Sequence, residues 1–208
     1  MTRREVLCAG LQALGMTLPV AAVDKLLAYV DLLEKWNKTY NLTAIRDGDE
    51  MVTQHLLDSL AIAPHLAGVR KLADIGSGAG LPGIPLAIAD AELEVTLIDS
   101  VQKKSAFQQQ AKIALNLDNV SIYSGRIEDY QSHSAFDAVT ARAFSELSKL
   151  TAVGSPLLQN AGRIYAMKGV LPQEEIDALP SNWRVSQALP LQVPGLNAER
   201  HLLILERN

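Results

Sequence analysis

A glycine-rich segment, residues 74–83, carries the most specific chemical signal in the sequence. It lies between a short apolar run and a helical stretch, and glycine recurs at alternate positions 76, 78 and 80. Glycine lets the backbone turn tightly and approach a ligand closely. An acidic residue, Asp99, ends the next apolar run, and a carboxylate there can accept both hydroxyl hydrogens of a ribose. The segment therefore predicts a nucleoside-binding turn between a strand and a helix.

Three interpretations of this turn compete. Residues 78–83 match the G-x-G-x-x-G pattern of dinucleotide-binding proteins, which is weak evidence by itself. Asp74 favours S-adenosylmethionine, because a carboxylate repels a pyrophosphate but suits the ammonium group of methionine, directly or through water. A tight turn without any ligand is disfavoured by four glycines in eight residues and by Asp99. No Gly-Lys-Ser/Thr sequence follows, which excludes a phosphate-binding loop for nucleoside triphosphates.

The elements around the turn alternate between strand and helix. Short apolar runs predict buried strands, and helical stretches lie between several of them. This alternation predicts a parallel sheet that is covered on both faces. The expected strands are residues 72–75, 95–98, 120–123, 136–140 and 163–167, and the expected helices are 81–89, 102–117 and 146–158.

The two ends of the chain depart from this alternation. Apolar residues recur at three- and four-residue steps over residues 20–40 and, more briefly, over 49–62, which predicts helices. Residues 183–193 and 200–207 are extended runs with no room for a crossover helix, so they should pair antiparallel. By analogy with Rossmann-like methyltransferases, we expect an α/β fold with a seven-stranded, mostly parallel sheet and an antiparallel last strand.

Length and composition limit the class of protein. The 208 residues suffice for one domain, in which we expect residues 1–66 to form an N-terminal helical cap on a core of residues 67–208. The net charge of −4 argues against general nucleic-acid binding, so any RNA contact requires a local basic patch. The single cysteine, Cys8, excludes an internal disulfide and a structural zinc site. No membrane helix or signal peptide is evident, and we expect a cytoplasmic monomer without a metal.

The sequence also limits the type of methyl transfer. A sulfonium methyl group is already activated, so such an enzyme mainly aligns donor and acceptor. Attack from a pyrimidine carbon needs a cysteine, and Cys8 is far in sequence from the sheet. Exocyclic amines are usually methylated beside an Asn/Asp-Pro-Pro-Tyr segment after the fourth strand, where residues 141–144 are Ala-Arg-Ala-Phe. Methylation at guanine N7 needs neither a cysteine nor such a segment, because the N7 lone pair is available at neutral pH.

Seven segments carry a family resemblance: residues 35–43, 55–59, 74–83, 97–100, 142–144, 168–169 and 199–202. Together they resemble the 16S rRNA guanine-N7 methyltransferases, historically called glucose-inhibited division protein B. The resemblance runs nearly from end to end. The glycine turn alone indicates a superfamily, whereas the Trp-Asn and Leu-Pro-Gly segments are far more specific. Ala141 stands where many members have serine.

The resemblance implies methylation at N7 of one guanine in the decoding-region loop of 16S rRNA. It implies S-adenosylmethionine as the donor, no metal, and rRNA within a small-subunit particle or assembly intermediate as the partner. The donor-binding residues that it implies, with two neighbours added from the turn, are Gly76, Ser77, Gly78, Leu81, Asp99, Ile127, Glu128 and Arg142.

Three basic residues are candidates for positioning the acceptor, and none is assigned as catalytic. Arg142 ends the fourth strand and could hold the methionine carboxylate, the guanine O6 or a surface ion pair. It should not donate hydrogen bonds to O6 and N7 together, because N7 must face the methyl group. Lys168 and Arg200 could each hold an rRNA phosphate or be solvated. His55 and His201 are expected to be structural.

Two other functions fit the same pattern. A small-molecule methyltransferase is slightly favoured by the acidic net charge, and it would be active without RNA. A non-catalytic ribosome-assembly factor would bind small-subunit particles without forming any methylated product. Trp36 and Tyr40 could stack on a base, but their helical spacing predicts packing in the core.

Overall fold

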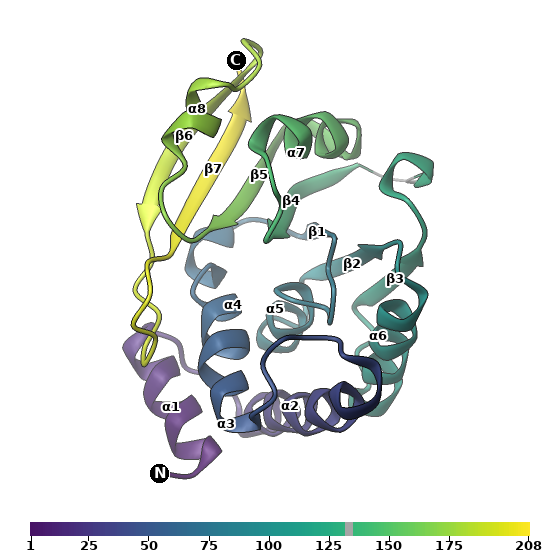
Figure 1. Ribbon diagram of the computed structural model, residues 1–208, viewed down its shortest axis with the longest axis vertical. Coiled ribbons are helices and arrows are strands. Elements are labelled where there is room, and N and C mark those ends of the chain that lie inside the picture. Colours follow the sequence, from purple (N-terminus) through teal and green to yellow (C-terminus); the bar gives the residue numbers. More distant parts are fainter. Residues whose placement is uncertain (132–134) are drawn as a thin grey trace.

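A seven-stranded sheet with strand order β3-β2-β1-β4-β5-β7-β6 runs through the described part of the computed structural model, residues 1–131 and 135–208 (Figure 1). Strands β1 to β5 pair parallel, and β7 pairs antiparallel with β5 and β6. This arrangement confirms the predicted fold class and the antiparallel C-terminal pair. The strands are β1 (Lys71–Ile75), β2 (Glu94–Asp99), β3 (Val120–Ser124), β4 (Phe136–Arg142), β5 (Leu158–Lys168), β6 (Trp183–Pro190) and β7 (His201–Arg207).

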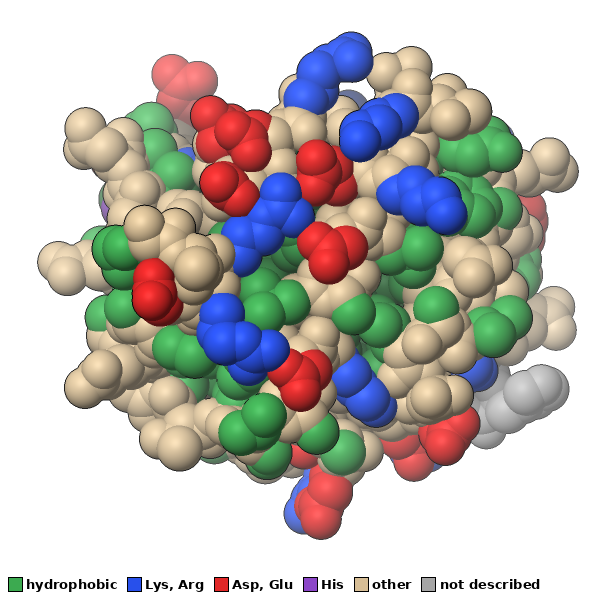
Figure 2. Space-filling view, turned by 90° about the horizontal axis from the view of Figure 1, so that it is seen from below, with side chains coloured by type: hydrophobic (Ala, Val, Ile, Leu, Met, Phe, Trp, Pro, Cys, Tyr) green, Lys and Arg blue, Asp and Glu red, His purple; other side chains and the backbone are tan. Residues whose placement is uncertain are grey.

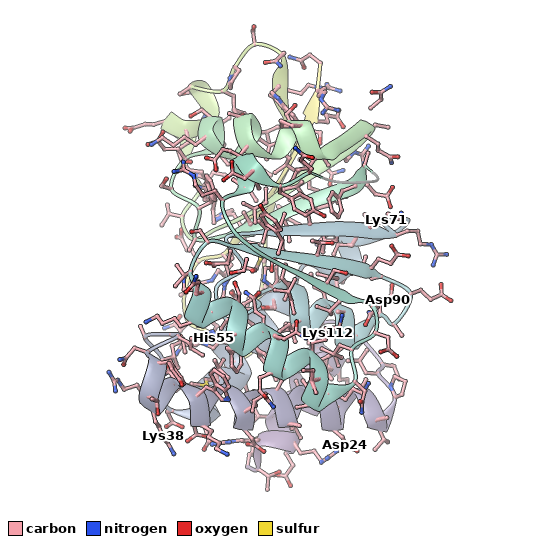
Figure 3. All side chains as sticks on the ribbon, turned by 90° about the vertical axis from the view of Figure 1, so that its right-hand side faces the viewer. Asp24, Lys38, His55, Lys71, Asp90 and Lys112 are labelled. Atoms are coloured by element: carbon pink, nitrogen blue, oxygen red, sulfur yellow. The ribbon has the colours of Figure 1, made fainter. Side chains whose placement is uncertain are left out.

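Helices cover both faces of the sheet (Figures 1 and 3). The N-terminal helices lie on one face together with α5 and α6, and α7 and α8 lie on the other face. The α-helices are α1 (Arg3–Ala13), α2 (Val20–Tyr40), α3 (Gly48–Met51), α4 (Asp58–Leu60), α5 (Gly83–Ala89), α6 (Gln102–Leu115), α7 (Leu147–Gly154) and α8 (Gln173–Asp177). A π-helix spans Val52–Leu57, and short 3-10 helices span Ala63–Leu66, Ile127–Asp129 and Ser155–Leu157.

The central strands are mostly apolar because both faces of the sheet are buried there. In β7, Leu202 and Ile204 join the core cluster beneath the N-terminal helices, whereas Leu203 and Leu205 join the cluster beneath α7. Successive side chains of a strand point to opposite faces, so a strand covered on both sides needs apolar residues at every position.

The N-terminal helices pack directly on the sheet-covering helices. Tyr29 of α2 is fully buried, and its ring centroid lies 6.0 Å from that of Phe107 in α6. The Tyr29 hydroxyl donates a 2.8 Å hydrogen bond to the carbonyl of Ala79 in the glycine turn. Residues of α1, α2, α5 and α6 share one apolar cluster, so the N-terminal segment contributes directly to the position of the turn.

Several predicted elements differ in detail. The expected helix over residues 49–62 contains the π-helix, and the expected helix over 146–158 ends at residue 154. β5 begins at Leu158, which pairs with Phe136 across an irregular register, so this strand is longer than predicted. Tyr40 is not in the core: it lies at the C-terminal end of α2 with 42% of its surface exposed, while Trp36 packs against Phe107.

The two ends of the strands face different surroundings. In Figure 3, Lys71 at the start of β1 and Asp90 before β2 lie at one side of the sheet, and His55 lies toward the other. Parallel α/β sheets bind ligands at the carboxyl ends of their strands. Within the ranges that the structure describes, no helix is both long and apolar enough to cross a membrane.

Candidate functional site

Two cavities adjoin at the carboxyl end of β4. The first, here the turn cavity, has a volume of about 340 Å³ and is lined by the last residues of β1 and β2, by residues that follow β1, β2 and β3, and by Phe144. The second, here the arginine cavity, also has about 340 Å³ and is lined by Arg142, Arg200, Asp58 and His55, among others.

Ala143 lines the arginine cavity and is followed in the chain by Phe144 of the turn cavity. It has φ +58°, a left-handed conformation that is rare for a residue with a side chain. Its neighbours line different cavities, Arg142 the arginine cavity and Phe144 the turn cavity. Such strain costs on the order of 1–3 kcal/mol and tends to persist where the surrounding fold enforces it. The backbone at this point brings the two cavities side by side.

Asp74 organises the glycine turn from within the protein. Its side chain is fully buried, and Oδ2 accepts a 2.8 Å hydrogen bond from the N–H of Gly83, the first residue of α5. Burial raises the pKa of Asp74 to about 7, while the Gly83 hydrogen bond opposes that rise. The carboxylate faces the interior and does not line the turn cavity, so the expected interaction with a ligand ammonium, directly or through water, stays a prediction.

The glycines of the turn adopt left-handed backbone conformations. Gly76 has φ +65° and Gly78 has φ +60°. There is space for a side chain at position 76, because a Cβ built there would meet no atom within 4 Å. Backbone conformation rather than lack of space therefore requires glycine at position 76, which is exposed and lines the turn cavity. Gly78 contributes its N–H, which donates a 2.8 Å hydrogen bond to Oδ2 of Asp99.

Asp99 is held in place at the end of β2. Its Oδ1 accepts a 2.9 Å hydrogen bond from the N–H of Val101, and the Lys104 ammonium lies 3.8 Å from Oδ2. Only 6% of Asp99 is exposed, and that residue lines the turn cavity. A carboxylate can accept about four hydrogen bonds, so both oxygens retain lone pairs for a ligand hydroxyl.

Asp58 joins the two arginines of the arginine cavity. Arg142 Nη1 donates to Oδ2 of Asp58 at 3.1 Å and to the carbonyl of Gln54 at 3.2 Å. Arg200 Nε donates to Oδ1 of Asp58 at 2.8 Å. The Gln54 carbonyl belongs to the π-helix, a feature that often marks functional sites.

Lys168 and the two histidines are already occupied by protein partners. Lys168 Nζ lies 2.7 Å from Oε2 of Glu175 and donates to the Phe144 carbonyl at 2.9 Å. His55 Nε2 lies 2.9 Å from the hydroxyl of Thr43, and burial, assisted by Arg142, lowers the pKa of His55 to about 4. His55 is therefore neutral at pH 7. Nδ1 of the other histidine, at position 201, lies 2.7 Å from the carbonyl oxygen of residue 169.

A protein-family model described as "GidB: rRNA small subunit methyltransferase G" matches residues 22–203. The chain belongs to this family. A ribosomal RNA small subunit methyltransferase G from Aromatoleum aromaticum is 54% identical over 203 residues, covering 96% of both chains. One from Neisseria meningitidis serogroup A is 51% identical over 207 residues, covering 100% of both.

Solved structures with the same fold include other methyltransferases. The glycopeptide N-methyltransferase MtfA, complexed with S-adenosylhomocysteine, has a TM-score of 0.62 at 12% identity, covering 74% of this chain and 87% of that chain. The mitomycin 7-O-methyltransferase MmcR has a TM-score of 0.64 at 15% identity, covering 86% and 60%. At this level of identity the similarity shows the fold alone.

The structure of this GidB-family member separates the residues predicted for the donor site. Gly76, Asp99, Ile127 and Glu128 line the turn cavity. Arg142 lines the neighbouring arginine cavity with Lys168 and Arg200. Ser77 and Leu81 are buried, with 1% and 4% of their surface exposed, and the half-buried Gly78 donates its N–H to Asp99.

Sequence reasoning missed three residues of the site. Gln108 is fully buried in α6, and its Nε2 donates to the Ser77 hydroxyl and the Gly78 carbonyl, each at 2.8 Å. Asp58 and Tyr29 were likewise not assigned roles. A buried polar residue within a helix is the available signal, but only tertiary structure reveals its partner. No group of three or more metal-ligating side chains occurs among the residues described.

Proposed function

We propose that the protein transfers the methyl group of S-adenosylmethionine to N7 of a guanine in the decoding-region loop of 16S rRNA. The observation that carries this proposal is the pair of adjoining cavities at the carboxyl end of β4. One has a wall suited to a nucleoside, and the other presents two arginines. Membership of the rRNA small subunit methyltransferase G family supports small-subunit rRNA as the substrate.

The turn cavity fits the donor. Asp99 offers carboxylate lone pairs to ribose hydroxyls, and its two backbone hydrogen bonds fix its orientation before a ligand arrives. Ile98 and Ile127 supply apolar walls for an adenine ring, and the open space beside Gly76 allows close approach to the backbone. Asp74 contributes by holding the turn through Gly83. The donor supplies an activated methyl group when bound.

The arginine cavity fits a guanine that attacks through N7. This attack requires no prior loss of a proton, so the neutral, hydrogen-bonded His55 is not needed as a base. Arg142 Nη1 already donates to two protein oxygens, so Nη1 and Nη2 are not both available for a two-point hydrogen bond to the base. Its remaining N–H groups can donate to guanine O6 and leave N7 free to face the methyl group.

The charge distribution favours a localised RNA contact. The chain has 19 Lys and Arg against 23 Asp and Glu. Figure 2 shows the face seen from below Figure 1, where basic and acidic side chains are interspersed. At the arginine cavity, by contrast, Arg142 and Arg200 share one carboxylate, Asp58, which leaves a net positive charge on this group of three. We infer that the substrate is rRNA within a small-subunit particle or assembly intermediate, whose shape supplies recognition beyond phosphate attraction.

The test uses purified protein, tritiated S-adenosylmethionine and small-subunit particles from cells that lack the enzyme. After digestion to nucleosides, the label should elute as N7-methylguanosine. Label in another nucleoside would refute the acceptor assignment, and transfer without RNA would favour a small-molecule methyltransferase. Stable particle binding with no labelled product would indicate a non-catalytic assembly factor.

A further inference from the structure

We propose that Asp58 is a positioning residue for the methyl acceptor: it orients Arg142 and Arg200 and limits the positive charge of the arginine cavity. This inference rests on the proposed function. Its observation is a single carboxylate whose two oxygens bind two different guanidinium groups, Oδ2 to Arg142 at 3.1 Å and Oδ1 to Arg200 at 2.8 Å.

The three residues come from distant parts of the chain. Asp58 is the first residue of α4, directly after the π-helix, Arg142 ends β4, and Arg200 precedes β7. The Asp58 side chain is only 4% exposed, whereas those of Arg142 and Arg200 are 23% and 27% exposed. All three residues line the cavity, but the carboxylate is the most buried group and the arginines keep more exposed surface. This geometry suits support of the ligand-contacting groups more than contact with the ligand itself.

The charge balance of the cavity depends on Asp58. Lys168 is paired with Glu175, and His55 is neutral because its pKa is about 4. Of the two arginine charges, Asp58 compensates one. Without this carboxylate, two partly buried guanidinium groups would face each other unpaired, and each would lose a charge-assisted hydrogen bond.

Loss of Asp58 should have two effects: methyl transfer becomes slower, and attraction to phosphate becomes stronger. Loss of Asp58 should let both arginines reorient, so the target guanine is held less accurately and methyl transfer slows. The same loss adds one positive charge to the cavity, so sequence-independent attraction to phosphate should increase and become more sensitive to salt. A purely structural role would instead weaken RNA binding, donor binding and catalysis together.

The principal variant is Asp58→Asn, which keeps the shape of the side chain and removes its charge. We expect kcat to fall about tenfold to a hundredfold, as for one lost charge-assisted hydrogen bond. Affinity for rRNA at low salt should be equal or higher, and its decrease with salt should be steeper. S-adenosylhomocysteine affinity should not change, because Asp58 does not line the turn cavity.

The matched control is Asp137→Asn, which makes the same change in net charge. Asp137 is near the opposite end of β4, where it accepts hydrogen bonds from the N–H groups of residues 70 and 71. It should leave kcat and the salt dependence unchanged. Asp58→Glu provides a second variant that retains the charge but displaces it by one methylene group, and it should lower kcat without changing the salt dependence.

The outcomes separate this inference from the proposed function. Full activity of Asp58→Asn, or a parallel fall in kcat, rRNA affinity and S-adenosylhomocysteine affinity, would overturn the positioning role. If Asp58→Asn does not fold, Asp58→Glu decides: a wild-type kcat overturns the role, and a lowered kcat with the wild-type salt dependence supports it. Failure of the wild-type protein to form N7-methylguanosine would refute the proposed function instead.

Discussion

The stability of the Asp74→Asn variant relative to the wild type should increase from acidic to alkaline pH, because residue 74 is fully buried within the glycine turn. Burial raises the pKa of Asp74 to about 7, from an ordinary value of 3.8. The folded protein therefore binds this proton more tightly than the unfolded chain does. Stability from the protonated carboxyl group is fully present below pH 3.8 and is lost as the pH rises to about 7.

The magnitude follows from the width of this pH window. Between the two pKa values, each pH unit lowers the free energy of unfolding by at most about 1.4 kcal/mol, and this slope flattens near each pKa. Ionisation therefore costs the wild type about 3 kcal/mol between pH 4.5 and pH 8. Asparagine does not ionise, and its carbonyl oxygen can still accept the hydrogen bond from Gly83. Its amide N–H groups would take the place of Oδ1, which has no partner among the residues described, at a pH-independent cost of about 1–3 kcal/mol.

The assay is urea unfolding of wild type and Asp74→Asn at pH 4.5 and pH 8. We expect the difference in unfolding free energy to shift toward the variant by about 3 kcal/mol between these values. His55 acts in the opposite direction: its lowered pKa makes stability rise with pH between about 4 and 6.5. Both proteins contain His55, so the difference between them isolates Asp74.

Two further measurements test whether the effect comes from the burial of Asp74. Asp137→Asn removes a half-buried aspartate that also accepts backbone N–H groups, and it reports what loss of such bonds does without full burial. Calorimetry with S-adenosylhomocysteine should give similar affinity for Asp74→Asn and wild type at pH 8. A pH-independent difference in stability would refute the burial argument, and a large loss of affinity would show that Asp74 contacts the donor after all.

The other predictions concern donor binding, the N-terminal helices and pH. Asp99→Ala should lower S-adenosylhomocysteine affinity about tenfold or more by calorimetry, because charge-assisted hydrogen bonds are worth about 1.5–3 kcal/mol; unchanged affinity would remove Asp99 from the donor site. Tyr29→Phe should lower the free energy of unfolding by about 1–3 kcal/mol, since it leaves the Ala79 carbonyl unsatisfied; urea unfolding checks this, and an unaltered midpoint contradicts it. A pH profile of kcat should show no inflection from His55 between pH 6 and 8, because its pKa is about 4; an inflection near 6.5 that disappears in His55→Gln would be inconsistent with its burial.

Much of the fold could be predicted because its signals are local. Alternating apolar runs and amphipathic stretches identified β1 to β4 and α2 within a few residues. The limits of β5 and the preceding helix were wrong, because Leu158 joins the sheet through pairing with Phe136. Tyr40 was misplaced for a similar reason: helical spacing gives the direction of a side chain, but not how far along the helix the covering elements extend.

The sequence by itself determined the glycine turn, the acidic residue after β2 and the parallel sheet that brings them to one edge. These features follow from backbone conformation and side-chain periodicity, which a short segment specifies. Only the tertiary structure decided that Asp74 faces inward and that Arg142 lines a second cavity. It alone showed that Asp58 joins residues 142 and 200. The direction in which a charged group points depends on burial and on partners far away in the chain, and no local pattern encodes those distances.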